Sequence, residues 1–125
     1  MLKKIKIEFL RDIIIVNLDD TDTAKKIWDL CPIRSVTNTW GNEIYFDTGI
    51  KVTKDNTAKD IIYLGEIAFW VEGSSIAIGF GATPISIADE IRLVTNANII
   101  GKTKSDLSRL GMVKSGEIVI VDRID

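Results

Sequence analysis

Turns recur along this chain at intervals of about eight to twelve residues, and short apolar runs lie between them. Such spacing is typical of antiparallel strands in a barrel or sandwich, because a parallel sheet needs a helix between most of its strands. We therefore expect a mainly β fold. The expected strands cover residues 2–9, 13–18, 43–46 (extended toward 52), 61–64, 67–71, 76–80, 91–94, 98–102 and 118–121.

The first two runs differ in pattern and therefore in expected burial. Residues 2–9 alternate apolar and charged side chains, as in a strand with one solvent face. Residues 13–18 are apolar at successive positions, which predicts a strand buried on both faces. Arg11 and Asp12 separate the two runs, so we expect an opening hairpin.

Two short helices are expected as well. The polar run 19–23 offers N-cap residues, and apolar residues then recur at helical spacing over 24–31. Pro32 ends this helix, because the residue before a proline avoids helical angles. A second helix over 105–110 ends at a glycine. The face of the first helix that plugs the core includes Trp28 and Cys31.

Composition excludes several chemistries. The chain has one Cys and no His, which excludes Cys/His zinc sites, Ser-His-Asp or Cys-His nucleophiles, and a histidine base. Asp19, Asp20 and Asp22 lack the glycine and distal glutamate of a calcium-binding loop, so we expect them to favour a helix start instead. We expect neither a metal nor a cofactor.

Charge and hydropathy bear on partners and location. With 16 basic and 18 acidic residues the net charge is −2, which argues against a nucleic-acid surface and an anionic membrane. No segment approaches the ~20 apolar residues of a membrane span, and charges interrupt the N-terminal apolar run, unlike a signal peptide. We expect one cytoplasmic domain over residues 1–125. Frequent Ile and Lys with no Gln are typical of thermophiles.

The most informative segment runs from Trp40 to Phe46. If Glu43 begins a strand, Glu43 and Tyr45 share one face, while Ile44 and Phe46 share the other and can enter the core. A carboxylate and a phenol then lie together at the surface beside Trp40. This arrangement suits a cationic or amide-bearing ligand through cation–π contacts and charge-assisted hydrogen bonds. The alternative is structural, with the indole covering a barrel mouth and the carboxylate capping turn amides.

Two further segments are candidates for binding or catalysis. Phe80 and Pro84 lie in a glycine-containing turn that lets backbone approach a ligand, although a close-packed barrel corner explains it equally well. Glu90 and Arg92 are weak catalytic candidates, together with Glu43. Asp89 and Glu90 cannot serve one site in a regular strand, since adjacent residues point to opposite faces, so an ion pair with Arg92 is the simpler interpretation.

Several motifs in order resemble a family of small archaeal and bacterial proteins with a cyclophilin-like fold and no established activity. The resemblance covers nearly the whole chain and is carried by 32–46 (with Trp-Gly-Asn-Glu-Ile-Tyr-Phe), 64–70, 78–92 (with Phe-Gly-Ala-Thr-Pro) and 98–107. It implies a closed eight-stranded β-barrel with a helix at each end. It does not imply prolyl isomerase chemistry, because the His, Gln and Phe-His-Arg or Gln-Phe-Phe segments of active cyclophilins are missing here.

Three functions remain open. The first is a barrel that binds a small molecule or peptide, with one pocket lined by Trp40, Glu43, Tyr45, Phe80 and Pro84. The second is an enzyme, either an atypical prolyl isomerase using Arg92 or a hydrolase using Glu43 or Glu90; the hydrolase requires a carboxylate with a raised pKa in a cleft. The third is a structural module that forms a homo-oligomer through a strand edge.

Overall fold

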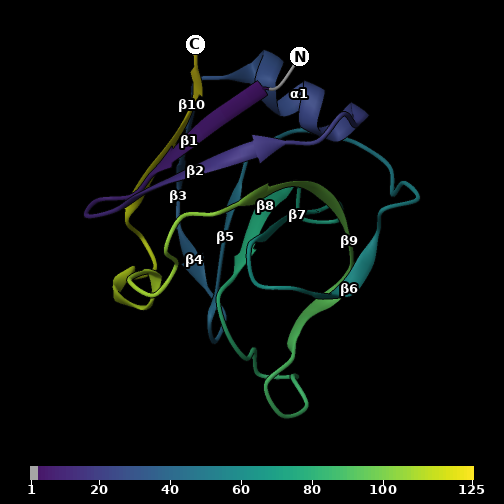
Figure 1. The fold of residues 1–125 in the computed structure, drawn as a ribbon, viewed down its shortest axis with the longest axis vertical. Helices are drawn as coiled ribbons and strands as arrows, with labels where there is room; N and C mark the ends of the chain where they lie inside the picture. The colour runs from purple at the N-terminus through teal and green to yellow at the C-terminus, as the bar shows by residue number, and fades with distance from the viewer. Residues whose placement is uncertain (1–2) are drawn as a thin grey trace.

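The computed structural model describes residues 3–125, and its strands form a curved, antiparallel sheet (Figure 1). Residue 2, expected in the first strand, lies outside the described range. In chain order the elements are β1 (Lys3–Glu8), β2 (Ile13–Leu18), α1 (Asp22–Leu30), β3 (Ile33–Val36), β4 (Asn38–Thr39), β5 (Glu43–Asp47), β6 (Lys59–Ile62), β7 (Glu66–Trp70), β8 (Ser75–Gly79), β9 (Ile91–Thr103), the 3-10 turn η1 (Leu110–Met112) and β10 (Ile118–Ile124).

The sheet curves into a nearly closed barrel. Its strands follow the order β3-β10-β1-β2-β9-β7-β8-β5-β4, with β6 off this path. Only Thr37 separates β3 from β4, so one continuous segment pairs with β10 through its first part and with β5 through its second. The expected mainly β barrel is confirmed, with nine strands on the path rather than eight.

The helix α1 forms where the sequence predicts one, over Asp22–Leu30 against the expected 24–31. Thr21 Oγ1 accepts a hydrogen bond of 3.1 Å from the Ala24 amide, which caps the N-terminus, and Cys31 is the C-cap before Pro32. Ala24 and Ile27 pack into the main core, and Trp28 and Cys31 are half-buried against it. Among the described residues, no helix has the length and apolar character needed to cross a membrane.

The expected second helix does not form in the described chain. Residues 105–109 make bends and turns that lead into η1, so the helical hydrogen bonding is limited to one 3-10 turn. Asp106 Oδ1 accepts a hydrogen bond from the Ser108 amide at 2.9 Å. Such local side-chain bonds compete with helix formation, which explains the shorter element.

Strand β9 covers 13 residues and replaces the two separate strands expected over 91–94 and 98–102. Its second half pairs with β7 and β2, whereas its first half pairs with β6. Thr95 and Asn96 therefore continue the strand instead of forming a turn. Figure 1 shows the long, curved course of β9 beside β6 and β7.

This course of β9 creates a second apolar cluster on the outside of the barrel wall. We call it the outer cluster; it consists of Ile62, Ala68, Ala77, Ile91, Leu93, Ala97 and Ile99, with Tyr45 packed against it. A Cβ added at Gly79 would lie 2.4 Å from Ile91 Cγ2, so only glycine lets the second layer approach this closely. The main core fills the barrel, and Phe46 and Phe69 are among its fully buried side chains.

The expectation that residues 13–18 are buried on both faces is wrong for one face. Ile14, Val16 and Leu18 point into the core. Ile13 and Ile15 are 51% and 36% exposed on the outside of the barrel. The opening hairpin itself is confirmed, with β1 and β2 in antiparallel register.

Candidate functional site

The β4–β5 hairpin carries the candidate site. The Trp40 amide donates to the Glu43 carbonyl at 2.9 Å, and the Glu43 amide donates to the Trp40 carbonyl at 3.2 Å. These bonds leave a loop of two residues, Gly41 and Asn42. Gly41 has φ +59°, the conformation that a type II′ turn requires of its first loop residue.

The hairpin tip packs against the turn that follows β8. The Asn42 carbonyl accepts from the Phe80 amide at 2.8 Å, and the Asn42 amide donates to the Ala82 carbonyl at 3.0 Å. A Cβ added at Gly41 would lie 2.9 Å from Pro84 Cδ. The structure thus brings together the two segments that the sequence analysis selected, 40–46 and 80–84.

The predicted ligand-binding residues do not all share one face. Asn38 lies opposite Tyr45 in the register, so Trp40, Glu43 and Tyr45 share the outer face of the hairpin. Phe80 packs against the main core. Pro84 is exposed at the turn. As predicted, Ile44 and Phe46 point into the core, with 0% exposure.

Glu43 is buried, whereas a place at the surface was expected. Its residue is 7% exposed, and its Oε1 atom is buried without a hydrogen-bond partner among the described residues. In the register Glu43 lies opposite Gly79, over which Ile91 and Ile62 pack. Burial raises the pKa of the Glu43 carboxyl to about 7. The carboxyl therefore changes between its protonated and ionised forms near neutral pH.

Trp70 lies beside this site on β7, directly after Phe69, and adjacent strand residues point to opposite faces. Phe69 is fully buried, and Trp70 is half-buried. The rings of Trp70 and Tyr45 meet edge to face, with centroids 5.7 Å apart. Trp70 Nε1 is buried and has no hydrogen-bond partner among the described residues. The residue whose identity reflects the position of Trp70 is Gly73, because a Cβ added at Gly73 would lie 2.2 Å from the indole.

Charged groups near the outer cluster are already paired. Lys59 Nζ lies 2.7 Å from Glu66 Oε1, which also accepts from the Tyr63 amide at 2.7 Å. The same ammonium lies 4.8 Å from the centroid of the Tyr63 ring. Glu66 therefore differs from Glu43, which is in the same sheet but forms no ion pair within residues 3–125.

Glu90 and Arg92 form the ion pair that the sequence favoured. Arg92 Nε donates to Glu90 Oε1 at 2.6 Å, and Arg92 Nη1 lies 3.3 Å from Asp60 Oδ2. The hydrogen bond from Arg92 lowers the pKa of the Glu90 carboxyl. Glu90 thus lacks the raised pKa that carboxylate-based hydrolysis requires, and the guanidinium is engaged by two acids.

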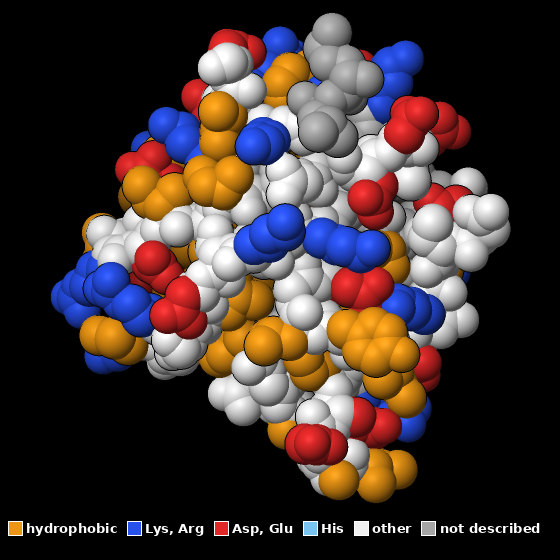
Figure 2. Space-filling model, viewed as in Figure 1, with side chains coloured by type: hydrophobic (Ala, Val, Ile, Leu, Met, Phe, Trp, Pro, Cys, Tyr) orange, Lys and Arg blue, Asp and Glu red, His pale blue; other side chains and the backbone are white. Residues whose placement is uncertain are grey.

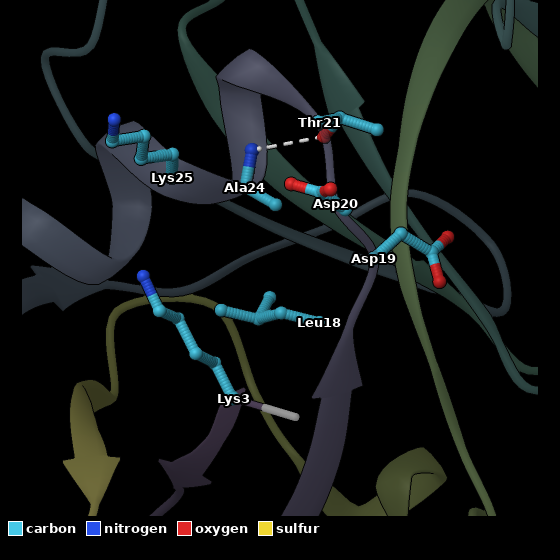
Figure 3. A pocket seen from close by; sticks show the side chains of 7 residues that line it. All are labelled: Lys3, Leu18, Asp19, Asp20, Thr21, Ala24 and Lys25. Carbon is cyan, nitrogen blue, oxygen red and sulfur yellow. Dashed lines mark hydrogen bonds between the residues drawn. The ribbon is translucent and has the colours of Figure 1, made fainter. Parts of the chain in front are cut away.

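A separate hollow of about 500 Å³ lies between the start of α1 and the ends of β1 and β2 (Figure 3). Its lining carries both signs of charge, with Lys3 and Asp20 extending toward the space and Asp19 turned away in Figure 3. Thr21 caps the helix here, as expected for this polar run. Within residues 3–125, no group of three His, Cys, Asp or Glu residues could hold a metal ion.

Comparison with known proteins agrees with this architecture. The solution structure of a hypothetical protein from Archaeoglobus fulgidus is similar, with a TM-score of 0.85 and 36% sequence identity, over 98% of this chain and 95% of that chain. Among curated proteins, none matches the chain. A family model described as Cyclophilin-like matches residues 3–122. The chain therefore belongs to the cyclophilin-like family.

Proposed function

We propose that this protein binds a small molecule or peptide at the β4–β5 hairpin, and that Glu43 receives an amine or another N–H donor of the ligand. The observation that carries the proposal is the buried Oε1 atom of Glu43, which has no hydrogen-bond partner among the described residues. An unpaired buried carboxyl destabilises a fold, because it loses hydration without replacing it. Such groups are concentrated at functional sites.

The surroundings of Glu43 suit a ligand that combines a positive or polar group with an apolar body. Trp40 and Tyr45 share its face, and the outer cluster supplies aliphatic contacts. An ammonium here gains from the carboxylate and from the aromatic rings. In our proposal the ligand approaches the outer face of the hairpin beside the 80–84 turn, where Pro84 is exposed.

The test uses isotope-labelled protein and two probe sets, short proline peptides and small primary amines. Native mass spectrometry of freshly purified protein first shows whether a ligand is retained. In amide spectra, a binding probe should shift residues 40–46 and 80–84, and Glu43→Gln should abolish these shifts. Glu90→Gln is the matched control and should retain them. Shifts confined to other segments, or shifts unchanged in Glu43→Gln, would contradict the proposal.

A second candidate function is acid–base catalysis by Glu43, because the pKa of about 7 is the feature that the hydrolase alternative requires. The expected signature is a rate that changes with pH near this value and disappears in Glu43→Gln. The prolyl isomerase alternative gains no such support, since Arg92 is held by Glu90 and Asp60.

A further inference from the structure

The outer face of the sheet β3-β10-β1-β2 is unusual for a surface in contact with water. On β1 the outward positions are charged: Lys4, Lys6 and Glu8. On the strands at either side, by contrast, most outward positions are β-branched and apolar. They are Ile13 and Ile15 on β2, Ile118, Ile120 and Ile124 on β10, and Val36 on β3.

Four of these apolar side chains are exposed in the single chain, and Ile120 and Ile124 are half-buried. Ile13 is 51%, Val36 is 50%, Ile118 is 44% and Ile15 is 36% exposed. A solvent-facing sheet normally shows polar residues at outward positions, and apolar runs on successive positions indicate burial on both faces. The sequence of β2 has the second pattern, yet the structure covers only its inner face. Figure 2 shows hydrophobic and charged side chains mixed at the upper left, where Figure 1 draws β10 and β1.

Four charges in the middle of this face lie in two neighbouring rows across the strands, and Lys4 lies in a third row with Ile124 and Asn17. One row contains Arg34, Ile120, Glu8 and Ile13, and the next contains Asp122, Lys6 and Ile15. Each row thus holds one acid and one base. In the first row the base is on β3 and the acid on β1, whereas in the second row the acid is on β10 and the base on β1. Glu8 and Lys6 therefore lie in neighbouring rows of the same strand. A surface with this arrangement is complementary to itself after a rotation of 180° about an axis between the rows.

We propose that a second copy of this chain covers this face in solution, related by a two-fold axis that runs across the strands between Lys6 and Glu8. In that arrangement Glu8 faces the partner's Lys6, and Ile13 faces the partner's Ile15. Arg34, which lies beside Ile120 in the register, comes within reach of the partner's Asp122. The same contacts occur twice, as in other two-fold interfaces, and sheets aligned in this way pack face to face.

Charge complementarity is the reason to choose a second copy over an unrelated partner. The two rows supply one acid for each base. The two-fold arrangement places Glu8 and Lys6 opposite each other twice and brings Arg34 near the partner's Asp122. The proposal is independent of ligand binding at Glu43, which lies in β5 outside this face. Experiments can therefore support or contradict the ligand-binding proposal and the dimer proposal independently.

The test is the molar mass in solution, measured by light scattering and sedimentation over a wide range of concentration. The wild-type chain should form dimers. Glu8→Lys places two like charges opposite each other on both sides of the axis, and it should raise the dimer dissociation constant roughly tenfold or more. Lys6→Glu should act in the same way. The combined Lys6→Glu/Glu8→Lys exchange should restore the dimer, which a folding defect could not do.

Asp89→Lys, an exposed charge reversal in the turn before β9, is the control and should leave the dimer intact. Circular dichroism verifies that each variant is folded. A wild-type chain that stays monomeric at every concentration overturns the proposal. So does a dimer that tolerates Glu8→Lys, or one that the charge exchange fails to restore.

Discussion

At the scale of single residues, three side chains bury a polar atom without a partner among the described residues: Asp12 in the β1–β2 turn, and Glu43 and Trp70 at the candidate site. Glu43 and Trp70 flank Tyr45 on the outside of the barrel wall, where Tyr45 contacts the indole and shares a strand face with the carboxyl. Burying a polar group in this way costs free energy, so the surrounding apolar packing must offset it. The effect of such a group on stability depends on its charge state and can be measured directly.

We predict that the stability of the unliganded protein decreases between about pH 4.5 and pH 7. The pKa of Glu43 is about 7 in the folded chain against 4.5 as its ordinary value, so the folded state holds this proton more tightly. The stability that this proton contributes, about 3 kcal/mol, is therefore fully present below pH 4.5 and is lost as the pH rises through 7. Glu43→Gln should remove this dependence and make the protein more stable at pH 8. Denaturant titrations over a pH series measure both effects.

The matched control for this prediction is Glu90→Gln. The pKa of Glu90 is lowered by Arg92, so its removal should leave the decrease between pH 4.5 and 7 in place. If Glu43→Gln keeps the same pH profile as the wild type, the carboxyl is not the group responsible.

The alternation of side chains along β5 predicted the inward-facing residues of this site correctly. The assignment of Ile44 and Phe46 to the core follows from strand periodicity alone, and the structure confirms it. The burial of Glu43 depends on residues 91–97, about fifty positions away, which fold back over the outer face. No pattern within 40–46 contains this information. Small residues at outward positions, such as Gly79 and Ala77, were the available signal that a second layer lies close.

At the scale of elements, the turn of the β4–β5 hairpin depends on Gly41. This glycine has φ +59°, and an added Cβ would lie 2.9 Å from Pro84 Cδ and 3.0 Å from Thr83 Cα. We predict that Gly41→Ala lowers the free energy of unfolding by about 2–3 kcal/mol, through backbone strain and crowding together. Gly49 has φ +75°, and an added Cβ there would have no atom within 4 Å. Gly49→Ala should therefore lower the free energy of unfolding by about 1 kcal/mol through strain alone. Equal losses in chemical denaturation would show that the 80–84 turn does not constrain the hairpin.

Most elements were predictable because their signals are local. The β1–β2 hairpin follows from alternation and α1 from its cap and Pro32. The continuous course of β9 was not predictable, because Thr95 and Asn96 look like a turn in sequence. They lie where the register between β6 and β9 shifts, and the pairing of Arg92 and Ala97 with β6 on either side keeps the strand continuous. Tertiary pairing overrides local propensity at such positions. The same reason explains why β3 and β4 escaped prediction, since their pairing with β10 and β5 is what defines them.

At the scale of the whole molecule, Asn98 connects three parts of the fold that lie far apart in sequence. Its side chain is 0% exposed. Its Nδ2 donates to the Thr53 carbonyl at 2.9 Å and to Thr23 Oγ1 at 3.2 Å, and its Oδ1 accepts from the Asp55 amide at 2.9 Å. A single amide of β9 thus holds both the helix α1 and the long connection between β5 and β6 against the barrel.

We predict that Asn98→Ala lowers the free energy of unfolding by about 3 kcal/mol, because it removes three hydrogen bonds, including those to the Thr53 carbonyl and from the Asp55 amide. The loss should be accompanied by faster amide exchange over residues 51–58, which the side chain holds in place. Asn96→Ala, an exposed position in the same strand, is the control and should change neither quantity. Faster exchange spread evenly over the barrel would mean that Asn98 stabilises the core as a whole and does not specifically hold this connection.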